Sequence, residues 1–510
     1  MASQRALACA HVRNQKQSNR GMPVTSKNQI QGGAAQEPAI DVVIMAAGKG
    51  TRMKSRLPKV LHRLAGRPLL QHVLDTAADL RARKVVVITG HGAIEVEAAC
   101  AGSTGAAAEF ALNFVRQEPQ LGTGHAVQQA VPVLADDGVV VVLSGDVPLT
   151  QSDTLFHLIK ASGGARLALL TLELANPAGY GRIVRAANVG GVADGAVQAI
   201  VEHKDASVAQ RQITEIYSGI MAVPAAQLKR WLARLDNQNA QGEYYLTDIV
   251  KFAVSDGVEV VAHKITDAVQ VAGVNSPVQL AELERAYQLG QAHRLMEEGV
   301  RLADPARLDV RGDLLCAHDV SIDVNCVFMG QVSLGEGVSI GAHCVIANAV
   351  IEDGAVIHPF THIDGEKLGV RVGAGALVGP FARLRPGTVL GAEVHIGNFV
   401  EVKNSTLAVG AKANHLAYLG DATVGERVNY GAGSITANYD GANKHRTVIE
   451  ADVHVGSNCV LVAPITLGAG GTVGGGSTLT KDTPAGALSV ARGKQVTIAN
   501  WSRPQKAPRG

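Results

Sequence analysis

The segment from Met45 to Met53, MAAGKGTRM, has the residue types of a phosphate-binding loop. Gly48 and Gly50 let backbone N–H groups approach phosphate oxygens, and the start of a following helix favours negative charge. Arg52 and Lys59 add cations, as needed when the α-phosphorus of a triphosphate is attacked and pyrophosphate leaves. The spacing is not that of a P-loop. A plain strand-to-helix turn with solvated charges is the alternative, and the two cations favour the phosphate site.

A carboxylate follows a second apolar run, at Asp146 in LSGDVPL. A carboxylate at the carboxyl end of a parallel strand is well placed to bind a metal ion. Mg²⁺, which binds few protein ligands and keeps its water, would suit such a carboxylate together with an amide oxygen and phosphate oxygens. The alternative for Asp146 is a helix N-cap or a turn residue.

Apolar strands that alternate with helices must position these residues. Continuous apolar runs at 42–45 and 139–143, and in KVVVITGHG, predict buried strands. LLQHVLDTAADL has apolar residues at i, i+3, i+4 and i+7 from Leu70, which predicts a helix. Such strands and helices predict a mostly parallel sheet that is covered on both faces and binds ligands at its carboxyl edge.

Beyond about Leu308 the pattern changes, because aliphatic residues recur every six positions. The repeating residues are Leu334, Ile340 and Ile346; Val372, Val378, Leu384, Leu390, Ile396 and Val402; and Val455, Leu461, Leu467, Val473 and Leu479. A sustained hexapeptide repeat predicts a parallel β-helix, in which stacking of the coils supplies the stability. A β-sandwich would instead show period-two strands spaced 8–12 residues apart.

Length and composition indicate that the chain folds into several domains. The chain has 510 residues, which is more than one hydrophobic core usually holds together. Its residues are 46% hydrophobic and 18% charged, and this composition excludes a mostly disordered chain. The net charge of +2 gives no general case for a nucleic-acid partner. No apolar run is long enough to span a membrane, and the scattered cysteines indicate buried thiols in a reducing compartment, so we expect a cytoplasmic protein. The expected parts are a disordered extension at 1–39, an α/β domain at 40–275, a helical linker at 276–306, a β-helix at 307–491 and a basic tail at 492–510.

Several motifs carry a resemblance to known enzymes. MAAGKGTRM followed by LPKVLH resembles the signature of sugar-1-phosphate nucleotidylyltransferases. Together with a hexapeptide β-helix that contains HLAYLGD and NYDGANKHRT, it is similar, over about 41–503, to one bacterial family of bifunctional N-acetylglucosamine-1-phosphate uridylyltransferases/glucosamine-1-phosphate acetyltransferases. The resemblance implies a Rossmann-like nucleotidyltransferase domain followed by a left-handed β-helix, and a homotrimer. It also implies acetyl transfer from acetyl-CoA to glucosamine-1-phosphate, then uridylyl transfer from UTP to N-acetylglucosamine-1-phosphate.

For uridylyl transfer the resemblance implies a set of contacts. The implied nucleotide- and sugar-binding residues are Ala46, Ala47, Gly48, Arg52, Lys59, Gln117, Gly122, Thr123, Gly181 and Glu202, and the implied Mg²⁺ ligands are Asp146 and Asn275. The Gln117 amide can donate and accept together, which matches a uracil edge. The family has EINTGI where this chain has EIYSGI, so Tyr217 replaces an Asn and is not among the expected site residues.

For acetyl transfer the resemblance implies His415 as the catalytic base, since an imidazole titrates near neutral pH. The implied acceptor-binding residues are Arg385, Lys403, Tyr418, Asn438 and Lys444, whose cations suit the sugar phosphate. The implied acetyl-CoA-binding residues are Asn429, Ala432, Tyr439, Ser457, Gly475 and Arg492. The family often has Ala where this chain has Gly475.

Two other functions fit parts of the pattern. One is a nucleotidylyltransferase with a single activity, whose β-helix is structural or regulatory; it does not require the cluster of His415, Asn438 and Lys444. The other is a non-catalytic assembly subunit, which would be expected to lose Arg52, Lys59 or Asp146, whereas this chain has all of them.

Overall fold

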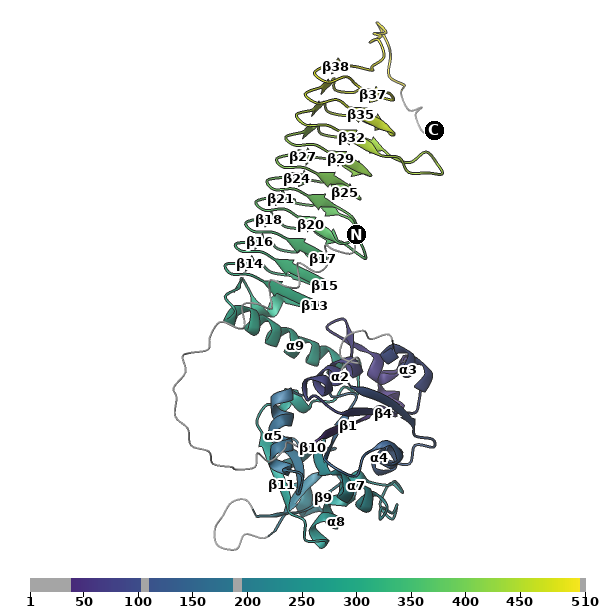
Figure 1. Cartoon of the computed structure of the whole chain (residues 1–510), viewed down its shortest axis with the longest axis vertical. Helices are drawn as coiled ribbons and strands as arrows, with labels where there is room; N and C mark the ends of the chain where they lie inside the picture. Colours follow the sequence, from purple (N-terminus) through teal and green to yellow (C-terminus); the bar gives the residue numbers. More distant parts are fainter. Residues whose placement is uncertain (1–37, 102–109, 187–194, 505–510) are drawn as a thin grey trace, which may run out of the picture. The chain divides into compact units, whose positions relative to one another are not determined.

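The computed structural model describes residues 38–101, 110–186 and 195–504. The expected disordered extension lies outside the described residues except for its last two positions, and so does the end of the expected basic tail, 505–510. The described chain forms an α/β domain, a long helix and a parallel β-helix (Figure 1).

A nine-stranded sheet is the centre of the α/β domain. Its main path runs β11-β7-β10-β6-β1-β4-β5, and β8 and β9 pair beside β10. Neighbours on the main path are parallel except at β10, which runs antiparallel to β6 and β7. The strands are β1 (Ile40–Met45), β4 (Lys84–Thr89), β5 (Ala111–Arg116), β6 (Val139–Ser144), β7 (Leu167–Glu173), β8 (Arg182–Arg185), β9 (Val197–Val201), β10 (Glu215–Pro224) and β11 (Val260–Ile265), with a separate hairpin of β2 (Arg63–Leu64) and β3 (Arg67–Pro68).

Two hydrophobic cores, one on each face, cover this sheet. The helices are α2 (Leu69–Asp79), α3 (Ala93–Ala101), α4 (Thr123–Gln128), α5 (Ser152–Ser162), α6 (Val208–Arg211), α7 (Ala225–Leu232) and α8 (Ile249–Ser255). Residues of α2, α3 and α5 join one core with Val42 and Ile44, whereas residues of α4, α7 and α8 join the other with Val43. Because side chains alternate along a strand, β1 is buried on both faces, as its continuous apolar run predicts.

The helix α9 (Pro277–Glu297) follows the α/β domain. The Ser276 hydroxyl caps it by accepting from the backbone N–H of Gln279, and proline occupies the first turn. Gln288 is almost fully buried and exchanges two hydrogen bonds with the backbone of Val310, at 2.7 and 2.8 Å. The helix is thereby fixed to β13 (Leu308–Cys316) of the β-helix.

Short parallel strands form the β-helix coils, one above the other (Figure 1). One ladder contains β12 (Arg301–Leu302), β14 (Ser321–Ile322), β16 (Ser339–Ile340), β18 (Val356–Ile357), β21 (Leu377–Val378), β24 (His395–Asn398), β27 (Lys412–His415), β30 (Asn429–Tyr430), β33 (His454–Val455), β36 (Thr472–Val473) and β38 (Leu488–Ser489). The second contains β13 (Leu308–Cys316), β15 (Cys326–Leu334), β17 (Val345–Ile351), β19 (His362–Asp364), β20 (Val370–Val372), β22 (Arg383–Leu384), β23 (Val389–Leu390), β25 (Glu401–Lys403), β26 (Thr406–Leu407), β28 (Tyr418–Gly420), β29 (Ala422–Val424), β31 (Ile435–Ala437), β32 (Thr447–Ile449), β34 (Val460–Val462), β35 (Ile465–Leu467) and β37 (Thr478–Leu479).

Every repeating aliphatic residue of the hexapeptide pattern is buried in one continuous core inside these coils. The predicted parallel β-helix is therefore confirmed. The described cysteines are free thiols, and burial raises the pKa of Cys100 to about 11 and that of Cys344 to about 12. In the described ranges, no helix has the length and apolar character needed to cross a membrane.

Candidate functional site

A cavity of about 480 Å³ opens at the carboxyl ends of β1 and β6. These strands are parallel neighbours with Met45 opposite Ser144, and the Gly145 N–H donates to the Met45 carbonyl at 2.9 Å. The expected residues that line the cavity are Ala46, Ala47, Gly48, Lys59, Gln117, Gly122, Thr123 and Asp146. It is also lined by residues that the sequence reasoning did not single out for the site, namely Met45, Lys49, Val60, Gln120, Ala126, Ser144 and Glu243.

The glycine-rich loop lies directly against Lys59. Gly50 has φ +60°, and a Cβ built there would lie only 2.7 Å from Cβ of Lys59. Only glycine accommodates that conformation and that approach together. Arg52 follows in a single 3₁₀ turn, Thr51–Met53, with an exposed side chain, and it does not line the cavity.

The two expected metal ligands converge on one cationic group. Nζ of Lys59 lies 2.5 Å from Oδ2 of Asp146 and 3.1 Å from Oδ1 of Asn275. The Val274 N–H donates to the Asp146 carbonyl at 2.9 Å, which holds the two segments together. A carboxylate and an amide oxygen that share one ammonium can share another cation, so the chemistry of these two residues fits a magnesium ion.

Gln117 is almost fully buried and its amide is oriented by its neighbours. Its Nε2 donates to the Gly122 carbonyl at 2.8 Å and lies 3.3 Å from Nδ1 of His125. The amide N–H groups are thereby directed into the protein, and the amide oxygen is the group that remains to accept from a base. The Thr123 hydroxyl accepts from the Leu246 N–H at 3.1 Å and keeps its own proton to donate.

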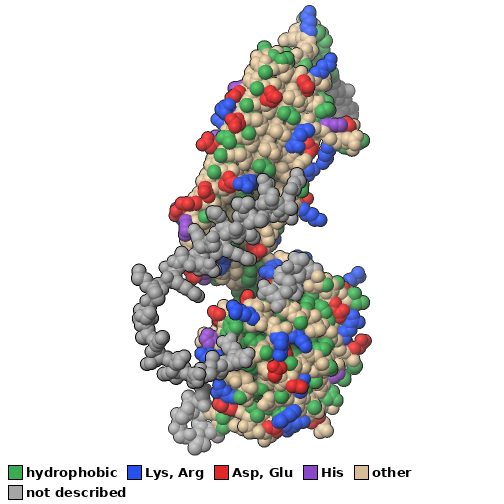
Figure 2. Space-filling view, viewed as in Figure 1, with side chains coloured by type: hydrophobic (Ala, Val, Ile, Leu, Met, Phe, Trp, Pro, Cys, Tyr) green, Lys and Arg blue, Asp and Glu red, His purple; other side chains and the backbone are tan. Residues whose placement is uncertain are grey.

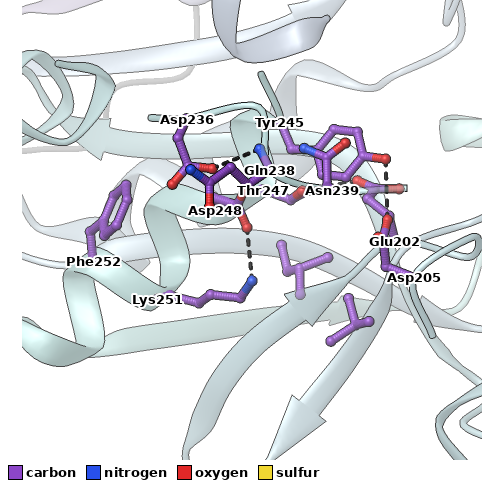
Figure 3. A pocket seen from close by; sticks show the side chains of 12 residues that line it. Glu202, Asp205, Asp236, Gln238, Asn239, Tyr245, Thr247, Asp248, Lys251 and Phe252 are labelled. Atoms are coloured by element: carbon purple, nitrogen blue, oxygen red, sulfur yellow. Dashed lines mark hydrogen bonds and ion pairs between the residues drawn. The ribbon is translucent and has the colours of Figure 1, made fainter. Parts of the chain in front are cut away.

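Gly181 and Glu202 lie together, and neither lines the first cavity. A Cβ at Gly181 would be 3.8 Å from both carboxylate oxygens of Glu202. Glu202 lines a second cavity of about 330 Å³, where Figure 3 shows it and Asp205 near Tyr245. Burial and neighbouring acids raise the pKa of the Glu202 carboxyl, although the Thr247 hydroxyl donates to it at 2.9 Å.

Tyr217 borders the same region. Its backbone N–H donates to the Gly181 carbonyl at 2.9 Å. Its hydroxyl is buried and has no hydrogen-bond partner among the described residues. Burial, with Glu202 nearby, raises the Tyr217 pKa well above its ordinary value, so the phenol is neutral.

On the β-helix, His415 ends β27 with its side chain exposed. Its Nδ1 lies 3.0 Å from Oδ1 of Asn398, which occupies the equivalent place on the preceding coil. An amide oxygen only accepts, so Nδ1 of the imidazole is the donor, and Nε2 is the ring nitrogen that lacks a proton in the neutral tautomer with this contact. Asn398 was not predicted from the sequence.

Three cations, Arg385, Lys403 and Lys444, lie close to one another on the β-helix. The like charges of Arg385 and Lys444 lower the Lys403 pKa. Arg385 donates to Glu401 at 2.8 Å, and Asp421 accepts from Asn438 at 2.5 Å. Over the face that Figure 2 shows, acidic and basic side chains are interspersed. A group of neighbouring cations suits a phosphate.

Three of the expected coenzyme-binding residues follow one corner of the rod from His415 onward. The Gly433 N–H donates to the His415 carbonyl at 3.2 Å. In the same way, the Asn458 N–H donates to the Ala432 carbonyl at 2.8 Å, and the Gly476 N–H donates to the Ser457 carbonyl at 2.8 Å. The corner thus carries Ala432, Ser457 and Gly475 on successive coils, about 4.8 Å apart. An extended ligand laid along the rod would meet each in turn.

The remaining expected residues lie at the edges of this arrangement. Tyr418 begins β28, pairs in register with Glu401 and is half-buried. Asn429 is exposed on β30, and the Tyr439 hydroxyl donates to the Gly441 carbonyl at 2.6 Å in an exposed hairpin. Arg492 is exposed, and its Cδ would lie 3.8 Å from a Cβ placed at Gly476.

Comparison with known proteins assigns the family. Residues 42–208 match the family described as the MobA-like NTP transferase domain. The "Bifunctional protein GlmU" of Albidiferax ferrireducens is 78% identical over 471 residues, which cover 92% of this chain and 100% of that protein. The proteins of the same name from Polaromonas naphthalenivorans and Cupriavidus pinatubonensis are 79% and 56% identical, and each match covers 92% of this chain and 98% or 99% of theirs. The chain belongs to the GlmU family.

Membership in the GlmU family confirms the expected two-domain fold and the expected pair of activities. The chain is a bifunctional transferase of UDP-N-acetylglucosamine synthesis, with acetyltransferase and uridylyltransferase activities. The chain combines a nucleotidyltransferase domain with a left-handed β-helix.

Proposed function

We propose that His415 is the general base that makes the β-helix an acetyltransferase for glucosamine-1-phosphate. The single observation that carries this proposal is the contact between Nδ1 of His415 and Oδ1 of Asn398, which leaves Nε2 able to take a proton. The sugar amine attacks the thioester carbonyl, a C–N bond forms and the C–S bond breaks. The amine proton passes to Nε2 and then to the departing coenzyme A sulfur.

The neighbouring polar groups hold the two substrates. Arg385, Lys403 and Lys444 neutralise the sugar phosphate, and Tyr418 and Asn438 bind the sugar. Acetyl-CoA extends along the corner of the rod, in contact with Asn429, Ala432, Tyr439, Ser457, Gly475 and Arg492. This arrangement is supported by the lowered Lys403 pKa and by the coil-to-coil alignment of the corner.

The α/β domain transfers the uridylyl group. A phosphate oxygen of N-acetylglucosamine-1-phosphate attacks the α-phosphorus of UTP, and the bond to pyrophosphate breaks. The backbone at Ala46, Ala47 and Gly48, with Arg52 and Lys59, holds the triphosphate. Gln117 accepts from the uracil N3–H beside Gly122 and Thr123, and Gly181 and Glu202 bind the sugar. Cytosine lacks that N3–H, so its pairing with the amide oxygen would fail.

Asp146 and Asn275 are the residues that would hold a magnesium ion. When bound there, the ion supplies charge neutralisation on the phosphates. The convergence of both oxygens on one ammonium supports this assignment.

We also propose that the protein is a cytoplasmic homotrimer, associated through its β-helices, in which Arg492 acts across a subunit interface. An exposed stack of aromatic rings on one corner of the rod supports association. The ring centroids of Phe360 and Phe381 are 5.0 Å apart, those of Phe381 and Phe399 are 5.3 Å apart, and all three side chains are about half exposed. Analytical ultracentrifugation of the wild type and of Phe381→Lys tests it. A wild type that sediments as a monomer overturns the trimer.

Reciprocal inactivation tests the assignment of the two sites. His415→Ala should lower thiol release from acetyl-CoA by roughly 10²–10⁴-fold and leave pyrophosphate release unchanged. Asp146→Asn should do the opposite. Loss of both activities in either variant, or of neither, would contradict the assignment.

A further inference from the structure

The Lys59 ammonium sits where a cation held by Asp146 and Asn275 would sit. It contacts Oδ2 of Asp146 at 2.5 Å and Oδ1 of Asn275 at 3.1 Å. The side chains of Lys59 and Asp146 are only 14% and 17% exposed. A pair so shielded is screened less by water and salt than a surface pair, so an incoming metal ion competes with a bound positive charge.

The position of Lys59 lets its charge serve either of two partners. Its backbone is held in a 3₁₀ turn, Lys59–Leu61, with its Cβ against Gly50 of the glycine-rich loop. Its side chain lines the same cavity as Gly48 and Asp146. A lysine has a flexible four-carbon stem, so one ammonium can pair with the Asp146 carboxylate or with a phosphate held at the loop.

We propose that Lys59 keeps divalent metal ions off Asp146 and Asn275 until a nucleoside triphosphate binds. A triphosphate then draws the ammonium from the carboxylate onto its own oxygens, and the two ligands become free. The inference rests on the metal site proposed above. Lys59 thereby couples binding of the metal ion to binding of the triphosphate. The metal ion binds better once the triphosphate has attracted the lysine, and the triphosphate binds better once the metal ion has displaced it, so the coupling is reciprocal.

Binding of Mn²⁺ to the full-length protein without nucleotide tests the inference. Free Mn²⁺ is measured by electron paramagnetic resonance for the wild type, for Lys59→Met, which keeps the length of the side chain and removes its charge, and for Lys49→Met. Lys49 lines the same cavity, and no hydrogen bond or ion pair joins it to Asp146 or Asn275 in the described residues. Lys59→Met should bind Mn²⁺ at least about tenfold more tightly than the wild type, and Lys49→Met should gain less than about threefold.

The double variant Lys59→Met/Asp146→Asn separates this inference from the metal site itself. It should lose the gained affinity. If Lys59→Met binds Mn²⁺ no more tightly than the wild type, including the case in which neither binds, exclusion by Lys59 is overturned. If the double variant keeps the gain, the ion is bound elsewhere and the proposed metal site fails. Thermal unfolding checks that each variant is folded, and Lys59→Gln replaces Lys59→Met if the latter is not.

Discussion

Replacing Asn398 with leucine should slow acetyl transfer while the chain stays folded. Oδ1 of Asn398 accepts from Nδ1 of His415 at 3.0 Å, and leucine has a similar shape without the acceptor. A hydrogen bond between neutral groups contributes about 0.5–1.5 kcal/mol, and one to a charged group about 1.5–3 kcal/mol. The imidazole becomes charged as it takes the amine proton, so the bond strengthens by about 1–1.5 kcal/mol in the transition state. Losing that difference lowers kcat about tenfold.

Thiol release from acetyl-CoA, with glucosamine-1-phosphate as acceptor, measures the effect. The leucine variant should lose about tenfold to thirtyfold in kcat, since the freed ring also spends time in unproductive orientations. KM for each substrate should stay within about threefold of the wild type, because Asn398 is a positioning residue and not one of the groups proposed to bind substrate. Asn398→Asp keeps an acceptor for Nδ1 and should stay within about threefold of the wild-type kcat. Pyrophosphate release is the internal control.

Two results would refute this reasoning. An equal loss of kcat in the leucine and aspartate variants would mean that the acceptor oxygen is not what matters at this position. A raised KM with an unchanged kcat would mean that Asn398 binds substrate and does not hold the histidine.

Three further changes test other parts of the two sites. Gly50→Ala places a Cβ 2.7 Å from Cβ of Lys59 at φ +60°, so pyrophosphate release should fall about tenfold or more; unchanged release would show that the loop can move. Lys403→Gln removes one of three neighbouring cations and should raise KM for glucosamine-1-phosphate about 10- to 100-fold, whereas the exposed Lys412→Gln should not. Burial raises the pKa of Glu202, so the folded wild type binds this proton more tightly than the unfolded chain and loses stability as pH rises above the ordinary carboxyl range. Glu202→Gln should therefore melt about 1–3 °C higher than the wild type near pH 8, with a gain that disappears near pH 4; a gain independent of pH would contradict this.

The sheet and the coils could be predicted because both are periodic at short range. The run at 42–45 is apolar at every position, and β1 is buried on both faces. Aliphatic residues six apart, such as Leu384 and Leu390, occupy equivalent places in the coil core. Patterns of this kind depend only on neighbours along the chain, so no knowledge of distant contacts is needed.

The partners of the catalytic groups could not be predicted in the same way. Asn398 lies 17 residues before His415, and it reaches the imidazole only because the coil between them has the length that stacks the two positions. Lys59 and Asn275 are 216 residues apart and meet through the sheet edge at Asp146. A search for Asn or Asp one coil before each functional side chain would have found Asn398. No local pattern in the sequence indicated that the Lys59 ammonium contacts both Asp146 and Asn275.

The regular corner also explains how a non-repeating hairpin can supply part of the acetyltransferase site. The insertion after Ala437 contains the antiparallel bridge of Tyr439 with Lys444, yet Asn458 still donates to the Ala432 carbonyl at 2.8 Å. The extra residues leave and rejoin the coil away from the corner, so the stack that begins at His415 is continuous across them. A rod of this kind can gain polar groups on one side without moving the base and the coenzyme corner, because each coil is aligned by its neighbours and not by its own length.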